Sequence, residues 1–285
     1  MEWPGASSLR PGGTTPSFHL VRSVLPPREP TMTEQQWPND PAPAAPGTPA
    51  EKASFIDDLI EIWFAPSKVF ARRRDSGFFG ILVLLTVLLG GLWMANAGAM
   101  QGIMDAEYQR QMAEVLKQNP SMTQEQLDAG KGFAQAAQTF GIWIGVPIAM
   151  LMVGLGAWIV GKVFGAQLGY GAATMVACWA YLPKVLESLL ITVQGLVLDT
   201  GAMRGRFQLS WGVGRFLDPE GSMGMQLLLG RIDVFTIWVS VLIAIGIVVV
   251  GKVDRSKLVP VAVVMWLLGA IPGGWALLME VLRGG

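Results

Sequence analysis

The chain has 285 residues, of which 52% are hydrophobic and only 15% are charged, and its formal net charge is zero. Soluble domains carry about 25% charged residues, and the apolar residues here gather into runs of about 20 or more, long enough to cross a bilayer. The composition predicts an all-α integral membrane protein and shows no basic stripe for nucleic acid. One cysteine, Cys178, excludes an internal disulfide, and one histidine, His19, leaves no His-based metal or acid–base cluster.

Residues 1–53 form a tail rich in Pro, Gly, Ser, Thr and Ala. Such a composition buries too little apolar surface to offset the entropy of ordering, so we expect the tail to be disordered. It contains no apolar core followed by a small-residue cleavage site, as a signal peptide would. Met32, which opens the polar sequence MTEQQWPND, is a candidate for the natural start of the protein.

Residues 54–75 are expected to form an amphipathic helix and elbow before the first apolar run. Ser54 and Asp57 have the spacing of a capping box. Helical spacing predicts an apolar and an acidic face, formed by Ile56, Leu59, Ile60 and Trp63 against Asp57, Asp58 and Glu61. The helix should end before Pro66, and a second turn carries Lys68, Arg72, Arg73 and Arg74. This amphipathic segment could lie in the membrane interface or pack against the spans, and the two placements are compatible.

Five apolar runs have the length of membrane spans, at residues 78–100, 139–164, 169–198, 232–251 and 258–282, within a membrane domain of residues 76–282. Residues 101–138 are polar, and Thr123 with Gln126 indicates a helix start. We expect a helical hairpin outside the hydrocarbon, whose second arm continues into the second span. Residues 199–231 form a second polar loop. Glycines spaced four apart favour close helix approach, at positions 141, 145, 161, 165 and 169.

The third run, Leu168–Leu198, carries Pro183, Lys184 and Glu187 near its centre. A charge at mid-bilayer costs roughly 3–10 kcal/mol, depending on how it is measured. A run of about 30 residues makes some 45 Å of helix, against a hydrocarbon core of about 30 Å. The run therefore has spare length, and Pro183 predicts a bend in it.

Lys184 and Glu187 are three residues apart and so share one helix face. Two interpretations follow. The pair is an ion, proton or lipid-headgroup site between spans, or it is a neutralised structural bridge with Asp233 or Gln194 as a further partner. The bend at Pro183 and the entry residue Asp233 favour a structural polar knot, while the ligand site is the sharper hypothesis.

Basic residues crowd next to the first span and in the loop between the fourth and fifth spans. They are Lys68 and Arg72–Arg74 in the first group, and Lys252, Arg255 and Lys257 in the second. The positive-inside rule then predicts a cytoplasmic N-terminus and, with five spans, an external C-terminus.

Three segments in order carry a family resemblance: WFAPSKVF at residues 63–70, AYLP at 180–183 and DVFTIW at 233–238. With the five spans, they resemble the Yip-one domain family, the Ypt/Rab-GTPase-interacting membrane proteins and their prokaryotic relatives, over residues 55–282. The landmarks are Trp63, Pro66, Phe70, Tyr181, Pro183, Phe235 and Trp238.

The resemblance implies five spans with a cytosolic N-terminus and, in eukaryotic members, roles in Golgi and ER vesicle traffic through Rab GTPases and partner Yip proteins. The Pro- and Ala-rich tail and the compact loops are typical of prokaryotic members, which favours the plasma membrane. A GTPase partner is implied by family analogy alone, and no GTPase-binding residue carries over.

The sequence contains no HExxH, GxSxG, P-loop or CxxC motif. It therefore predicts no enzyme, no cofactor and no metal site. The first hypothesis is a membrane scaffold or adaptor, in contact with the bilayer and with other membrane proteins or a second copy. The second is a transporter or channel for a small solute, ion or lipid, with Lys184 and Glu187 in its pathway. Asp233 is the third intramembrane polar candidate. An intramembrane enzyme is the third and has the least support.

Overall fold

The computed structural model describes residues 54–200, 203 and 205–282, apart from several side chains between residues 111 and 138. The expected disordered tail, with Met32 and His19, lies outside the described residues. Within them every regular element is helical, as predicted. Five helical segments are long and apolar enough to cross a membrane: Phe79–Ala99, Thr139–Val163, Tyr170–Val197, Val234–Gly251 and Arg255–Leu282.

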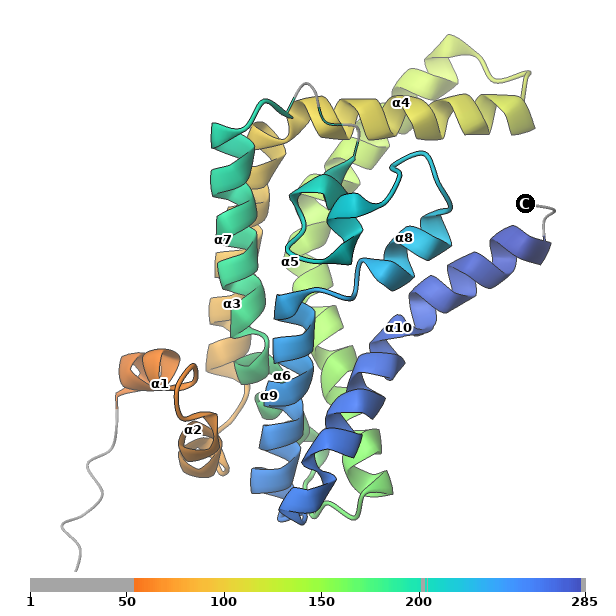
Figure 1. Cartoon of the computed structure of the whole chain (residues 1–285). Coiled ribbons are helices and arrows are strands. Elements are labelled where there is room, and N and C mark those ends of the chain that lie inside the picture. The colour runs from red at the N-terminus through yellow and green to blue at the C-terminus, as the bar shows by residue number, and fades with distance from the viewer. Residues whose placement is uncertain (1–53, 201–202, 204, 283–285) are drawn as a thin grey trace, which may run out of the picture. The chain divides into compact units, whose positions relative to one another are not determined.

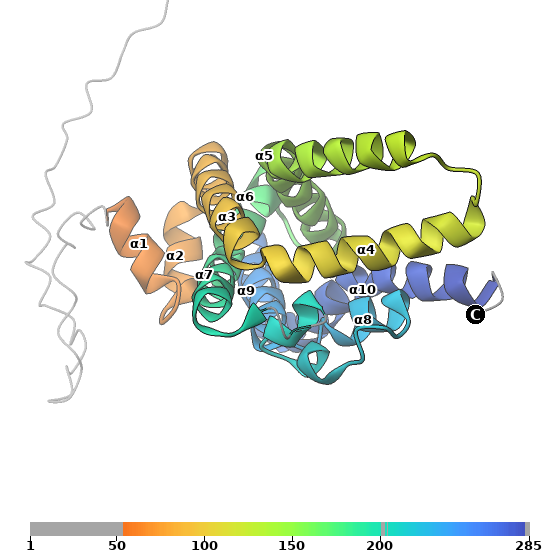
Figure 2. The same ribbon diagram turned by 90° about the horizontal axis from the view of Figure 1, so that it is seen from above.

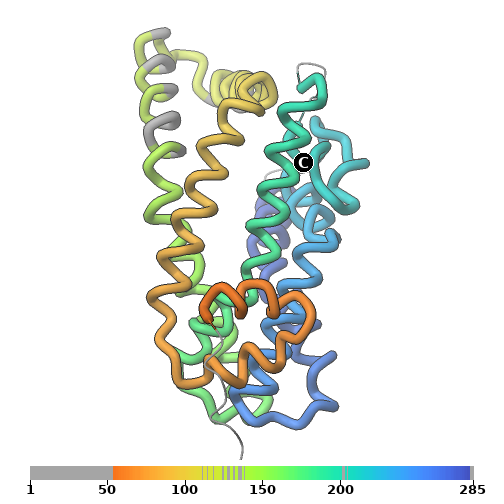
Figure 3. The backbone as a smooth tube through the Cα atoms, turned by 90° about the vertical axis from the view of Figure 1, so that its left-hand side faces the viewer, coloured from red at the N-terminus to blue at the C-terminus, as the bar shows by residue number. Residues whose placement is uncertain are grey.

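The elbow consists of α1 (Phe55–Glu61) and α2 (Pro66–Arg73), and the Ser54–Asp57 capping box is present. The acidic face of α1 is not exposed along its whole length. Asp58 is fully buried, whereas Ile56 and Ile60 are 65% and 58% exposed. The reason is that α1 turns Asp58 towards the arginines of α2, which neutralise it. Figure 3 shows the elbow crossing beside one end of the spans.

The first span is α3 (Phe79–Ala99), and α4 (Gln101–Gln118) follows it and turns away from its direction. α5 (Gln124–Val163) begins with the predicted Thr123–Gln126 capping box and runs on without interruption into the second span. The expected hairpin and its continuous second arm are therefore present, as Figures 1 and 2 show.

The third span is two helices, α6 (Tyr170–Ala180) and α7 (Leu182–Val197), which meet at Tyr181. Pro183 lies in the first turn of α7, where its missing N–H costs nothing, but it cannot continue the hydrogen bonds of α6. The predicted bend is present. Residues 173–180 of α6 are all buried, whereas the outer side of α7 is exposed along its length.

The polar stretch between the third and fourth spans is more ordered than the sequence predicted. It contains two 3-10 helices, η2 (Arg206–Leu209) and η3 (Val213–Phe216), and then α8 (Met223–Leu229). The stretch ends at α9 (Val234–Gly251), which a 3-10 turn, η4 (Arg255–Lys257), joins to α10 (Leu258–Leu282). α8 packs against α10 at a very close approach, because a Cβ on Gly224 would lie 2.3 Å from the backbone nitrogen of Leu277.

In the predicted glycine series only Gly161 has a near neighbour, and the closer helix contacts fall on other glycines. A Cβ added to Gly141 or Gly145 would meet nothing within 4 Å, while one on Gly161 would lie 3.1 Å from Leu168. The tightest contacts between spans are at Gly154, where a Cβ would lie 2.8 Å from the Thr174 Cα, and at Gly246, 2.3 Å from Val176. Spacing alone could not say which glycines face a neighbour.

Candidate functional site

The core of the site is the first turn of α9. Asp233 is the N-cap of this helix, and its Oδ1 accepts hydrogen bonds from the backbone N–H groups of Phe235 and Thr236, both at 2.9 Å. Only 4% of the Asp233 side chain is exposed. A carboxylate at a helix N-terminus is stabilised by the exposed amides and by the helix dipole, so a buried charge is tolerated here.

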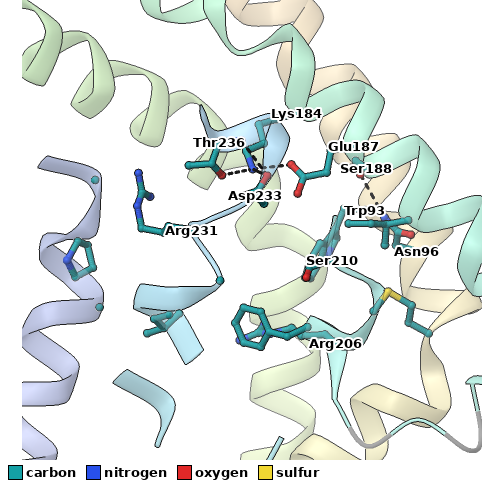
Figure 4. Close-up of a pocket in the computed structure, with 18 residues that line it drawn as sticks. Trp93, Asn96, Lys184, Glu187, Ser188, Arg206, Ser210, Arg231, Asp233 and Thr236 are labelled. Atoms are coloured by element: carbon teal, nitrogen blue, oxygen red, sulfur yellow. Dashed lines mark hydrogen bonds and ion pairs between the residues drawn. The ribbon is translucent and has the colours of Figure 1, made fainter. Parts of the chain in front are cut away.

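Lys184 reaches this turn from α7. Its Nζ lies 2.6 Å from the Glu187 carboxylate and 3.7 Å from that of Asp233, and it donates to the Thr236 hydroxyl at 2.8 Å. The structure therefore brings together all three residues that the sequence singled out, Lys184, Glu187 and Asp233 (Figure 4). Gln194, the alternative partner, is elsewhere and donates to the carbonyl of Leu209 at 3.5 Å.

A cavity of about 580 Å³ lies beside this cluster, within the size range of ligand pockets, about 300–1,000 Å³. The spans α3, α7, α9 and α10 contribute to its wall, and so does the stretch between α7 and α9. Its charged lining consists of Lys184, Glu187, Arg206, Arg231 and Asp233. The polar cluster is thus exposed to a cavity and is not sealed in the helix packing.

Polar atoms in the wall of this cavity lack hydrogen-bond partners. Asn96 is 8% exposed; its amide nitrogen donates to Ser188 at 3.3 Å, but its Oδ1 has no partner. The Ser210 hydroxyl and the Arg231 Nε are also buried and without a partner. Buried polar groups are rarely left unpaired, and each such group calls for an explanation.

Arg231 and Arg206 are the residues that the sequence analysis missed. Both lie in the stretch that the sequence analysis described as a polar loop. Outside the helical spans there is no residue periodicity that would predict which side chains point into the bundle. Arg206 lies 3.8 Å from Glu107, which also accepts from the Arg206 backbone N–H at 2.9 Å. The one available signal was the density of glycines around these arginines, which allows close backbone packing.

A second ionic cluster ties the elbow to the bundle. Asp58 accepts from Arg72 and from Arg73, the latter at 2.6 Å, and the Arg73 guanidinium lies 5.6 Å from the Trp179 ring centroid. Arg72 also bonds Glu61, and this hydrogen bond is the main cause that raises the pKa of Arg72 above its usual value. No cavity described here is lined by this cluster, and the burial of Asp58 within it favours a structural role.

The family landmarks lie at structural joints. Pro66 opens α2, and Phe70 is fully buried beside α9. Tyr181 and Pro183 form the break in the third span, and Asp233 with Phe235 forms the cap of α9. The other landmarks have looser surroundings: Trp63 bonds the Leu59 carbonyl at 3.1 Å, and Trp238 is 41% exposed.

Comparison with known proteins gives one match. The family model of the Yip1 domain matches residues 60–276, which is most of the chain and includes all five spans almost completely. No curated protein matches the chain, and neither does any solved structure. Because the match agrees with the order of the landmarks and with the five apolar helices, this multi-pass membrane protein belongs to the Yip1 domain family.

Proposed function

We propose that this protein binds a charged or amphiphilic ligand between its spans, in the cavity beside Lys184, Glu187 and Asp233, and that it is not an enzyme. One observation carries the proposal: the ionic cluster lines a cavity of about 580 Å³ instead of being enclosed by side chains. Charged residues within membrane helices are costly and typically mark solute pathways or binding sites. Transport of the ligand is one use of such a site.

Accessibility of the cavity can be tested with two neighbouring cysteine variants. Ser188 lines the cavity, whereas Leu189, the next residue on α7, is 47% exposed and does not line it. The only native cysteine, Cys178, is fully buried and serves as background. In liposomes, a charged, membrane-impermeant thiol reagent should modify Ser188→Cys but neither Leu189→Cys nor the unaltered chain. An unreactive Ser188→Cys would contradict the proposal.

A second candidate function is a scaffold or adaptor that works at the membrane surface through the elbow. The observation that favours it is that the elbow exposes apolar side chains. Ile56, Ile60 and Phe64 are 65%, 58% and 85% exposed. The opposite side of the elbow is anchored by Val69 and Phe70, both fully buried. Such a surface suits the membrane interface or a partner protein.

The scaffold function is tested by affinity capture from native membranes. Ile56→Glu with Phe64→Glu alters only exposed positions and should remove partner proteins that the unaltered chain retains. Lys184→Met should leave capture unchanged, since that residue is inside the bundle. A GTPase among the captured proteins would extend the family analogy to this chain. The location that we propose is the plasma membrane, with the N-terminus on the cytoplasmic side.

A further inference from the structure

Arg231 is the one charged residue of the cavity whose position suits an external counter-ion. No carboxylate of the described residues lies within ion-pair distance of it. Its Nη2 donates to the Trp266 carbonyl at 3.2 Å, and its Nε has no partner. Burial lowers the pKa of the guanidinium from its usual value, yet an arginine stays protonated in proteins. Arg231 therefore presents a positive charge to the cavity.

The two acidic residues both lie beside Lys184, which offsets part of their negative charge. Glu187 is paired with Lys184 at 2.6 Å. Asp233 accepts two backbone hydrogen bonds on the same oxygen that lies 3.7 Å from Lys184. Because Lys184 offsets the nearby carboxylates and the Arg231 Nε has no partner, we infer that the cavity favours an anion over a cation.

The guanidinium is held in a fixed position against α10. The Trp266 indole donates back to the Arg231 carbonyl at 3.2 Å, so the two residues form a reciprocal pair. Gly269 makes the space for it, because a Cβ there would lie 2.3 Å from Nη2 of Arg231. A donor held in place before the ligand arrives loses less entropy on binding.

A second cavity, of about 540 Å³, starts at the same residues and continues between α5, α9 and α10. It shares Lys184, Arg231 and Thr236 with the first, but most of its wall is apolar: Met152, Val153, Ile243, Met265, Leu268 and Ile271. Met152 and Ile271 are each 60% exposed, so this cavity reaches the outer surface of the bundle, where lipid chains lie.

The two cavities together have the polarity and the length of one lipid leaflet. The charged end lies at Asp233, and the apolar part reaches Ile243, ten residues further along α9. Ten residues of helix make about 15 Å, half of a hydrocarbon core of about 30 Å. A lipid with its headgroup at the start of α9 would place its acyl chain along this wall.

We propose that the cavity binds an anionic phospholipid, with the phosphate at Arg231 and an acyl chain between α5 and α10. The proposal rests on the ligand site of the previous subsection and names its ligand. The headgroup belongs to the leaflet opposite the elbow, because Arg74 at the end of the elbow bonds the carbonyl of Val249, at the other end of α9.

Native mass spectrometry of the full chain in detergent tests this, with phosphatidylglycerol and phosphatidylcholine of equal chain length as probes. Both lipids carry the phosphate, but the choline cation of phosphatidylcholine cancels its charge and would be repelled by Arg231. The unaltered protein should therefore bind phosphatidylglycerol about tenfold more tightly, which corresponds to about 1.4 kcal/mol. Arg231→Gln should remove this preference and Arg231→Lys should keep part of it. Arg215→Gln, an exposed arginine of the same stretch that does not line the cavity, should leave it unchanged.

Two further experiments distinguish a lipid ligand from a free anion: competition with inorganic phosphate and the variant Leu268→Trp. Leu268→Trp narrows the apolar cavity. It should weaken the binding of phosphatidylglycerol and leave the binding of inorganic phosphate unchanged. If phosphate displaces the lipid at equal concentration and Leu268→Trp has no effect, the site binds free anions and the lipid proposal fails. Equal lipid preference in Arg231→Gln and the unaltered chain also overturns it. In both cases modification of Ser188→Cys would still support the ligand cavity, whereas its absence would reject that cavity independently.

Discussion

The molecule contains two ionic clusters with opposite surroundings. At the elbow, Asp58 is fully buried and is bonded by both Arg72 and Arg73, with the Trp179 ring covering one side. Beside the start of α9, Lys184 is paired as well, but a large cavity lies next to it and Arg231 carries a charge with no nearby carboxylate partner among the described residues. An ion pair alone therefore does not distinguish a structural cluster from a functional one. A neighbouring cavity and unpaired polar atoms do.

The largest expected effect is at the enclosed cluster. Asp58→Asn leaves two arginines without their shared carboxylate, and breaking a buried pair typically costs about 3–5 kcal/mol. The side chains of Arg72 and Arg73 are 34% and 22% exposed, so water compensates them in part. We expect a loss of about 2–3 kcal/mol in the free energy of unfolding, measured in detergent. Asp75→Asn, on the exposed side of the same region, should have little effect.

The close packing of α5 against α6 should have the second largest effect. Gly154→Ala places a methyl group 2.8 Å from the Thr174 Cα, so α5 and α6 must move apart. Overpacking of this kind costs about 1–3 kcal/mol. Gly141→Ala is the matched control, because it meets no atom within 4 Å and gains helix propensity. Equal thermal stability of the two variants would show that α5 and α6 are not packed as described.

The cavity cluster should tolerate substitution better. In Glu187→Gln, Lys184 keeps Asp233 and the Thr236 hydroxyl as partners, and the cavity can admit water. We expect a loss of less than about 1 kcal/mol, the usual value for a pair that solvent can reach. A loss as large as that of Asp58→Asn in the same unfolding assay would make this cluster structural too, and would remove the contrast between the two.

The sequence predicted the local features because each depends on a few neighbouring residues. Capping boxes at Ser54 and Thr123, the break at Pro183 and the five apolar runs are of this kind. The pairing of Lys184 with Glu187 followed from helical spacing. The middle of the third apolar run, however, need not be the middle of the membrane.

What the sequence could not predict depends on how separate helices are aligned. Lys184 lies beside the first turn of α9, and the 18 residues of that helix make about 27 Å, close to the full hydrocarbon thickness of about 30 Å. The charges are then expected near one boundary, not at mid-bilayer. The burial of Asp58 and the inward position of Arg231 likewise follow from contacts with distant segments: α2 for Asp58, and α10 for Arg231.

An experimental structure of the full chain in nanodiscs that contain phosphatidylglycerol tests the central claim most directly. We predict elongated density that begins within hydrogen-bond distance of Arg231 and follows the apolar wall between α5 and α10. A structure in which the cavity is closed and Arg231 is paired with a carboxylate of the chain would contradict the account, because no space or free donor would then remain for a ligand.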